Sequence, residues 1–476
     1  MLSKRHILLY LFICLLVLAP FSKYPSIAIP LYNFSSFRVG LYQILTGLFV
    51  MFSAIDIYRT KHISINKNVI YPAMFFLIIL WLGIIWAIDK PRSVLLATSI
   101  TLLLATTISA YWFTTRRLTK SNIRTISSWL LISGIVFSIL AIGQFIVSTI
   151  TTQTFGILCT NCTNAVFGFP RINLFAAEPQ FLANSLLPVF SVSIYIYYKF
   201  KTKLALFSLF LCSVTIALTF SRGAFVAVFI GFGSFIFGMA LAKQLYIKKL
   251  LLIIVILLAS FIFGFILLIA SASYVHKNSP NITYDTTKTM LEQLSLGKIN
   301  LPEKKHASIQ QATPSTTPIK TDNFVSPGLI KASTNERLSA AQLAINAWQH
   351  NTQTLLVGVG AGNLGPFVVA NIDKTAPNNL TVYIFYVLLL AELGLAGLVS
   401  FIWLFIYSIY KLWDIANKRR YSLSIVIASV LVAFLVQYFF FGSYINVVYI
   451  WVWLGLALGI ISIDIKHLSK LLDFEL

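Results

Sequence analysis

Long apolar runs separated by short polar stretches make up most of this sequence. A helix of about 20 mostly apolar residues is long enough to cross the hydrocarbon core of a bilayer. Runs of this kind predict twelve transmembrane helices, at residues 7–22, 37–57, 69–88, 93–114, 124–150, 179–198, 203–220, 223–242, 249–272, 384–410, 421–439 and 443–463. The pattern therefore predicts an all-α polytopic membrane protein.

One polar interval, from Ser273 to Thr381, is much longer than the others and predicts a large, partly ordered loop between the ninth and tenth helices. Its first part, Lys277 to Ser333, has a composition typical of flexible chain. Its second part has a helical pattern from Asn335 to Trp348, then a glycine-rich turn, Gly358 to Asn363, where backbone approaches a neighbour. The predicted organisation is helices 1–5 (residues 1–150), helices 6–9 (151–272), the large loop (273–381) and helices 10–12 (382–476).

The distribution of Lys and Arg predicts the orientation, because cytoplasmic loops retain these residues. If the N-terminus is cytoplasmic, 21 of the 36 basic residues fall on the cytoplasmic side and 6 in short segments on the other side. The remaining 9 lie in the large loop, whose length exempts it from the rule. Both termini are therefore expected in the cytoplasm and the large loop outside.

Composition supports a membrane protein in contact with lipid and excludes nucleic acid as a partner. The chain is 58% hydrophobic and 11% charged, whereas soluble domains are about 25% charged. Its net charge of +22 comes from short basic clusters between apolar runs, without a nucleic-acid-binding motif. Cys159 and Cys162 have CxxC spacing but no second ligand pair, which argues against a zinc site; on an oxidising face they would permit a small disulfide.

Two outward-facing positions combine charge with an unusual local sequence. Arg222 follows Ser221 in a turn with almost no loop between two apolar runs, and its guanidinium fork suits bidentate binding of phosphate. The alternative is an arginine that ends a helix and extends toward the interface. Glu178 lies before Pro179, near Arg171, where it could take a proton from a sugar hydroxyl. Its alternative role is to complement the helix dipole.

Two further charged residues are candidates in or after the large loop. Arg337, beside Glu336, either binds an anion or forms a weak surface ion pair. Glu392 lies inside an apolar run, where an acid is costly unless it is functional or paired through a structural hydrogen bond. The outward segments lack an Asp-x-Asp pair, so neither a metal nor a cofactor is expected.

The order of these features resembles the O-antigen ligase/polymerase superfamily of bacterial membrane glycosyltransferases. The stretch from Arg171 to Gln180 looks like the family's entry to its sixth helix. The resemblance extends over residues 171–397 and rests mainly on Ser221-Arg222-Gly223, Arg337, Trp348, Gly358-Val359-Gly360-Ala361-Gly362 and Glu392-Leu393-Gly394. Outside that range only the number of helices matches.

The resemblance implies an enzyme of lipopolysaccharide and cell-envelope polysaccharide biosynthesis in the bacterial cytoplasmic (inner) membrane. It would transfer a glycan from undecaprenyl diphosphate to an acceptor glycan or lipid, by inversion and without a metal. Arg222, Arg337 and Arg171 would bind the diphosphate, and Glu178 or Glu392 would act as the base. A chain-length regulator protein is a further expected partner.

A departure from the family pattern favours a polymerase over a ligase. Ligases usually carry a His-Asn pair before the acidic-Gly segment, whereas this chain has Pro377-Asn378-Asn379. One rival interpretation is a transporter or flippase for lipid-linked sugars, but a long loop after the ninth helix breaks the six-plus-six repeat of many transporters. A glycan-binding membrane scaffold without activity is a third interpretation.

Reporter fusions test the predicted orientation. Alkaline phosphatase, which folds to an active form only after export, is expected to be active when fused after Gln310, because the large loop is predicted to lie outside. A matched fusion after Lys248, in a segment predicted to be cytoplasmic, should be inactive. Activity at Lys248 together with inactivity at Gln310 would reverse the topology.

Overall fold

The computed structural model describes most of the predicted helices and the second half of the large loop. The described residues are 4–28, 38–60, 67–151, 171–275, 327–419, 422–443 and 447–463, with positions 284, 287, 288 and 291 between them. Cys159 and Cys162, and most of the stretch from Lys277 to Ser333, lie outside the described residues. The predictions of a disulfide and of a flexible segment therefore stay predictions.

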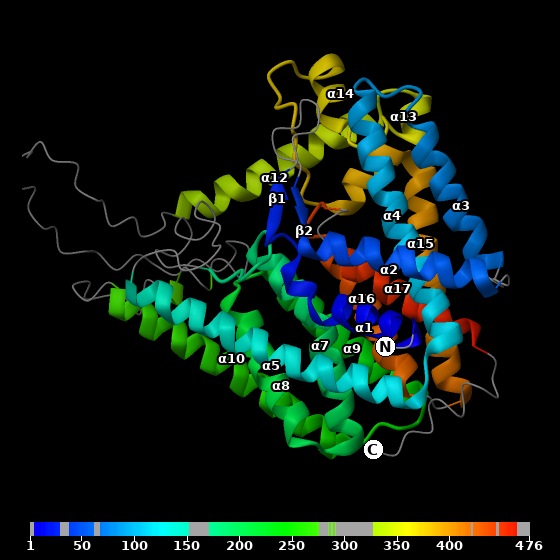
Figure 1. Ribbon diagram of the computed structural model, residues 1–476. Helices are drawn as coiled ribbons and strands as arrows, with labels where there is room; N and C mark the ends of the chain where they lie inside the picture. The colour runs from blue at the N-terminus through cyan, green and yellow to red at the C-terminus, as the bar shows by residue number, and fades with distance from the viewer. Residues whose placement is uncertain are drawn as a thin grey trace, which may run out of the picture.

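Apolar helices dominate the described chain and make it a helical membrane protein (Figure 1). By length and composition, seven of them can cross a membrane: α2 (Leu41–Thr60), α4 (Lys90–Arg117), α5 (Lys120–Thr151), α7 (Pro179–Phe200), α9 (Arg222–Leu241), α10 (Ile247–Val275) and α15 (Phe385–Arg419). Five shorter apolar helices are α1 (Lys4–Val17), α3 (Lys67–Leu82), α8 (Lys203–Leu218), α16 (Ser422–Gln437) and α17 (Val448–Ser462). Each of the twelve overlaps one predicted run.

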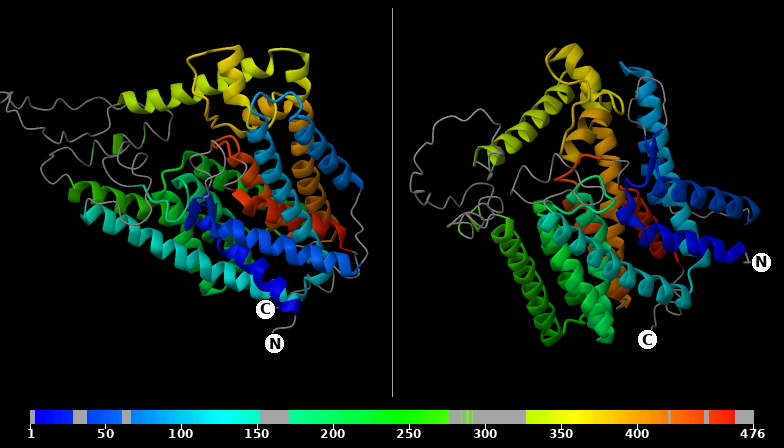
Figure 2. Two further views of the ribbon diagram at one scale, coloured as in Figure 1. Left: turned by 45° about the horizontal axis from the view of Figure 1, so that its top comes forward. Right: turned by 60° about the vertical axis from the view of Figure 1, so that its left-hand side comes forward.

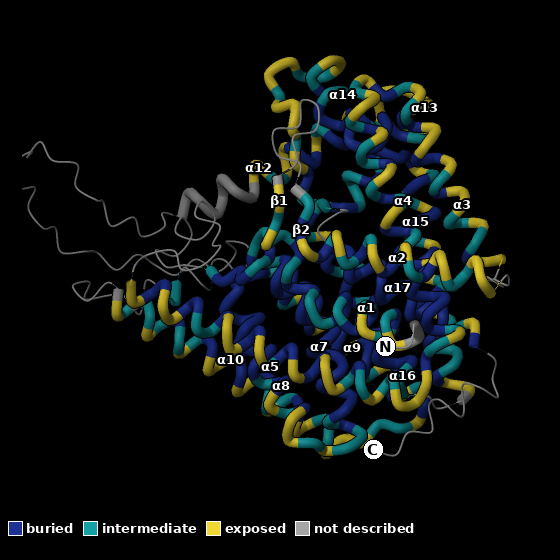
Figure 3. The backbone as a smooth tube through the Cα atoms, in the orientation of Figure 1, coloured by how far each residue is buried: buried dark blue, intermediate teal, exposed yellow. Residues whose placement is uncertain are grey.

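The helices differ strongly in how much protein surrounds them (Figure 3). In α7, 94% of the most apolar stretch is buried, whereas in α10 the corresponding share is 28%. Helix α17 packs along α4, and α16 packs along α9. Small residues permit this close packing: a Cβ atom at Gly455 of α17 would lie 2.3 Å from the Thr107 carbonyl oxygen of α4. α7 is thus a central helix, and α10 presents its apolar surface to lipid.

The second half of the large loop forms three helices at the N-terminal ends of α4 and α15 (Figures 1 and 2). They are α12 (Pro327–Trp348), α13 (Thr352–Val357) and α14 (Leu364–Asn371). α12 confirms the helical pattern predicted from Asn335 to Trp348 and begins earlier. α13 and α14 were not predicted, because one or two helical turns leave little periodic signal. A short antiparallel pair, β1 (Ser26–Ala28) and β2 (Arg38–Gly40), was also not predicted.

The glycine-rich turn packs backbone against backbone on α15. The sequence predicted a close backbone approach at this turn, without naming the neighbour. α15 is kinked at Gly394, where φ is 66°. The Gly360 amide donates to the Glu392 carbonyl oxygen at 2.9 Å. A Cβ atom at Gly358 would lie 2.3 Å from that same oxygen, and one at Gly394 would lie 2.3 Å from the Leu356 carbonyl carbon. Glycine at these positions is therefore required for the contact.

Polar contacts with α4 fix the same region from its other side. Asn363 accepts from the Asp89 amide at 2.7 Å and donates to the Asp89 carbonyl at 3.2 Å. The Arg92 guanidinium donates to the Asn379 side chain and to the Asn378 carbonyl, both at 3.1 Å. Asn378 and Asn379 therefore join this segment to α4.

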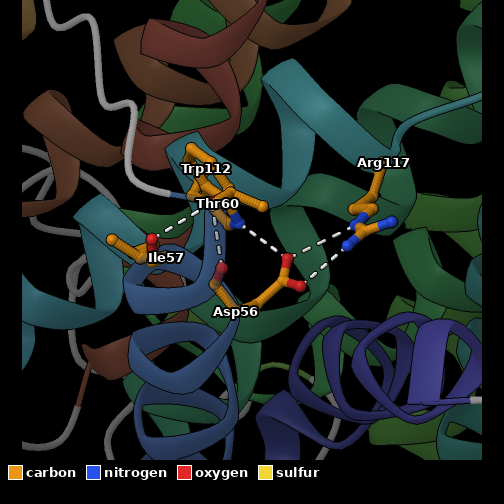
Figure 4. Close-up of polar contacts among 5 residues, drawn as sticks. All are labelled: Asp56, Ile57, Thr60, Trp112 and Arg117. Carbon is orange, nitrogen blue, oxygen red and sulfur yellow. Dashed lines mark hydrogen bonds and ion pairs between the residues drawn. The ribbon is translucent and has the colours of Figure 1, made fainter.

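A polar network joins the C-terminal ends of α2 and α4 (Figure 4). The distribution of basic residues predicts that these ends lie on the cytoplasmic side. Arg117 donates to Asp56 at 2.7 Å, and the Trp112 indole donates to the same carboxylate at 2.9 Å. Both partners are partly buried, so the charge-assisted bonds join the two helices more strongly than an exposed ion pair would.

Alanine substitutions test the backbone contact between the glycine-rich turn and α15. Gly394→Ala should lower the free energy of unfolding by about 1 to 3 kcal/mol, because a side chain is strained at positive φ and collides with neighbouring backbone. The measurement is thermal unfolding of the purified protein in detergent. Gly143→Ala is the matched control, since nothing lies within 4 Å of a Cβ atom at that position. Equal unfolding temperatures for the two variants would contradict the contact.

Candidate functional site

Three arginines from distant parts of the sequence form a cation cluster near the N-terminal ends of α7 and α9. Arg171, before α7, interacts electrostatically with Arg222 at the start of α9 and with Arg337 on α12. Arg222 also interacts with Arg337. The carboxylate of Glu178 is the acidic partner of Arg171. The structure thus brings together four charged residues that the sequence singled out, whereas their chemical roles stay predictions.

A tight turn places Arg222 at the first position of α9. Phe220 has a φ of 51°, and the Ser221 side chain accepts from the Ala224 amide at 3.3 Å, which caps the helix. A Cβ atom at Gly223 would lie 2.5 Å from the Phe440 ring, so no larger residue fits beside the arginine. The turn is as short as the sequence predicted.

Part of the Arg222 guanidinium is buried without a counterpart. Its Nη1 atom has no hydrogen-bond partner among the residues that the structure describes. Leaving a charged donor in this state costs free energy, because the group has lost its hydration and gained no bond. An anion bound at the cation cluster would satisfy this donor.

Arg171 holds the turn that carries Arg222. Its Nε donates to the Thr219 carbonyl at 3.0 Å, and its Nη2 donates to the Phe220 carbonyl at 3.1 Å. Burial lowers the pKa of Arg171 to about 10, while Glu178 opposes the shift; the group is still a cation at neutral pH. The sequence marked Arg171 as a third ligand of the diphosphate, but it missed this role in positioning the turn.

Arg337 stacks on an aromatic ring that the sequence analysis did not single out. The guanidinium carbon lies 4.6 Å from the ring centroid of Tyr383, in the segment before α15. Desolvation raises the pKa of Tyr383 above its ordinary value; Glu336 and Glu178 act in the same direction, and Arg337 opposes them. A lone tyrosine before an apolar run carries no sequence signal for this contact, because its partner lies far away along the chain.

Glu178 lies at the edge of the cation cluster. It occupies the N-cap position of α7, before Pro179, but its side chain makes no capping hydrogen bond. The carboxylate instead accepts from the side-chain amide of Gln180 at 2.8 Å. It also interacts electrostatically with Arg171 and Tyr383. Its side chain is partly exposed.

Glu392 lies in a different environment, at the kink of α15. Its side chain is 4% exposed, and its main-chain carbonyl accepts from Gly360 of the glycine-rich turn. Glu178, in contrast, is an electrostatic partner of Arg171. The structure therefore places Glu178 in the cation cluster and the main chain of Glu392 in the contact between the turn and α15.

Comparisons with known proteins do not assign the chain to a family. No protein-family model matches the sequence, and no curated protein matches it significantly. Within the described ranges, no group of three His, Cys, Asp or Glu side chains is placed to hold a metal ion. The functional argument therefore rests on the geometry of the cation cluster and on the order of the motifs.

Proposed function

We propose that this protein is a membrane glycosyltransferase of the O-antigen ligase/polymerase type. It transfers a glycan from undecaprenyl diphosphate to an acceptor glycan, and polymerisation of repeat units is favoured over ligation to a lipid. The observation that carries the proposal is the buried Nη1 of Arg222, which lies in a cluster of three guanidinium groups and has no hydrogen-bond partner among the described residues. Such a cluster fits a diphosphate ester, which carries a negative charge on each phosphate.

The proposal includes a topology in which all twelve apolar helices cross the bacterial cytoplasmic membrane. Both termini are cytoplasmic, and the cation cluster lies at the outer face. The shortest of the twelve, α1, has 14 residues and so spans about 21 Å at about 1.5 Å per residue. Flanking residues and local thinning of the bilayer complete such a crossing at modest cost.

The proposed mechanism uses the arginines to stabilise the leaving group. The acceptor hydroxyl attacks the anomeric carbon on the face opposite the diphosphate. The new carbon–oxygen bond forms while the bond to the phosphate oxygen breaks, and the electron pair leaves with the diphosphate. Arg222 and Arg337 stabilise this charge at a low-dielectric boundary, where fixed cations act more strongly than in water. Glu178 takes the proton from the hydroxyl.

A transporter or flippase for lipid-linked sugars is the second candidate. The observation in its favour is Gln437 of α16, whose amide nitrogen and oxygen are both buried without a hydrogen-bond partner among the described residues. Polar groups inside a membrane bundle often mark a substrate path. The three arginines of the cation cluster nevertheless lie together near the N-terminal ends of α7 and α9, which favours chemistry at the surface.

Replacement of Arg222 tests the diphosphate site. Arg222→Lys keeps the charge but loses the bidentate fork, so polymer formation should fall at least about tenfold. The measurement is polysaccharide chain length in cells that carry the variant, normalised to its abundance in the membrane. Arg124→Lys, an exposed arginine on α5, is the matched control. Normal polymer from an abundant Arg222→Lys variant would exclude the phosphate-binding role.

Replacement of the two acids identifies the base. Glu178→Gln should reduce turnover by about 10²- to 10⁴-fold, because an amide cannot accept the proton. Glu392→Gln should lower the amount of folded protein more than the turnover per molecule. Asp414→Asn, which breaks a surface ion pair with Lys418, is the control for loss of a carboxylate. An inactive, abundant Glu392→Gln variant together with an active Glu178→Gln variant would make Glu392 the base.

A further inference from the structure

The cation cluster contains a mutual repulsion that the protein must offset. Arg222 and Arg337 disfavour the charged form of Arg171, and Arg337 disfavours that of Arg222; Glu178 is the acidic partner of Arg171. Arg171 is held by two backbone carbonyls, and Arg222 is held at the first position of α9, a helix of the bundle. Arg337 lies on α12, which belongs to the large loop and not to the bundle, so a separate contact must hold it near the other two arginines.

Tyr383 supplies that contact. The face of an aromatic ring attracts a cation through its quadrupole, and the Arg337 guanidinium carbon lies 4.6 Å from the centre of the Tyr383 ring. The ring belongs to the segment immediately before α15, and α12 also packs against α15. The stack therefore joins a residue of the loop to the helical bundle at the edge of the cluster.

The pKa of the Tyr383 hydroxyl is raised. Desolvation is the main cause, and electrostatic interactions with Glu336 and Glu178 act in the same direction. The hydroxyl consequently stays protonated at neutral pH and carries no negative charge that would compete with a bound anion. The ring thus contributes an attractive face for the guanidinium and no charge of its own.

We propose that Tyr383 is a positioning residue for the diphosphate site: its ring orients the Arg337 guanidinium beside Arg222, so that one diphosphate is bound from both α9 and α12. This inference rests on the proposed function. It adds a residue that itself makes no contact with the reacting atoms. It also assigns the aromatic ring, and not the phenolic hydroxyl, as the group that matters.

Binding of undecaprenyl diphosphate to the full-length protein in lipid nanodiscs tests the assignment without requiring turnover. Tyr383→Leu removes the ring and should weaken binding by about 2- to 30-fold, the range that a cation–π contact supplies. Tyr383→Phe keeps the ring and should bind within about twofold of the unmodified protein, since only the hydroxyl is lost. Tyr410→Leu is the matched control, because Tyr410 stacks with Lys411 at 5.7 Å elsewhere on α15.

A double-mutant cycle separates positioning from a general loss of structure. In an Arg337→Met background, Tyr383→Leu should cause no further loss of binding, because the stacked partner is already absent. Thermal unfolding of each variant identifies any that fails to fold. If Tyr383→Leu fails to fold, the binding of undecaprenyl diphosphate is compared between Tyr383→Phe and Arg337→Met. Equal losses from Tyr383→Phe and Tyr383→Leu, or additive losses in the cycle, would overturn the assignment.

The same measurements distinguish failure of this inference from failure of the proposed function. If Arg222→Ala and Arg337→Ala bind undecaprenyl diphosphate as well as the unmodified protein does, the diphosphate site itself is refuted. If both variants bind more weakly but Tyr383→Leu does not, the site stands and the positioning role of Tyr383 is refuted.

Discussion

The low dielectric of the lipid interior is the constraint on which this structure depends. Backbone polar groups have no water to bind there, so the chain satisfies them within helices. Charged side chains are costly at the same depth, and the network of Asp56, Trp112 and Arg117 shows how partly buried charge near one end of a helix is offset by direct bonds. The cation cluster is the exception, because three guanidinium groups interact with one another there and the acidic partner of Arg171 is Glu178.

That exception is maintained by the surrounding backbone. Arg171 donates to the two carbonyls that end α8, and this contact holds the turn from which Arg222 projects. Electrostatic sites that are organised before the ligand arrives need little rearrangement during reaction. An anion bound at the cluster would satisfy the Arg222 Nη1 donor, which has no hydrogen-bond partner among the described residues.

The outer loop is connected to the bundle by two kinds of contact. Close backbone packing between Gly358 and the kink at Gly394 holds α13 against α15, and the stack of Arg337 on Tyr383 holds α12 at the cluster. The first contact depends on the absence of side chains, and the second depends on a particular side chain. Substitutions in the two contacts should therefore have different consequences, for stability in one and for ligand binding in the other.

Local pattern in the sequence determined the helices, the short turn at Arg222 and the close approach of the glycine-rich segment. Each of these depends on residues that are near one another in the chain, so hydropathy and glycine content are sufficient evidence. Only the tertiary structure stacked the Arg337 guanidinium on the Tyr383 ring and assigned Arg171 to the turn. These relations join residues far apart in sequence, and their contact depends on how the helices pack, which no local pattern specifies.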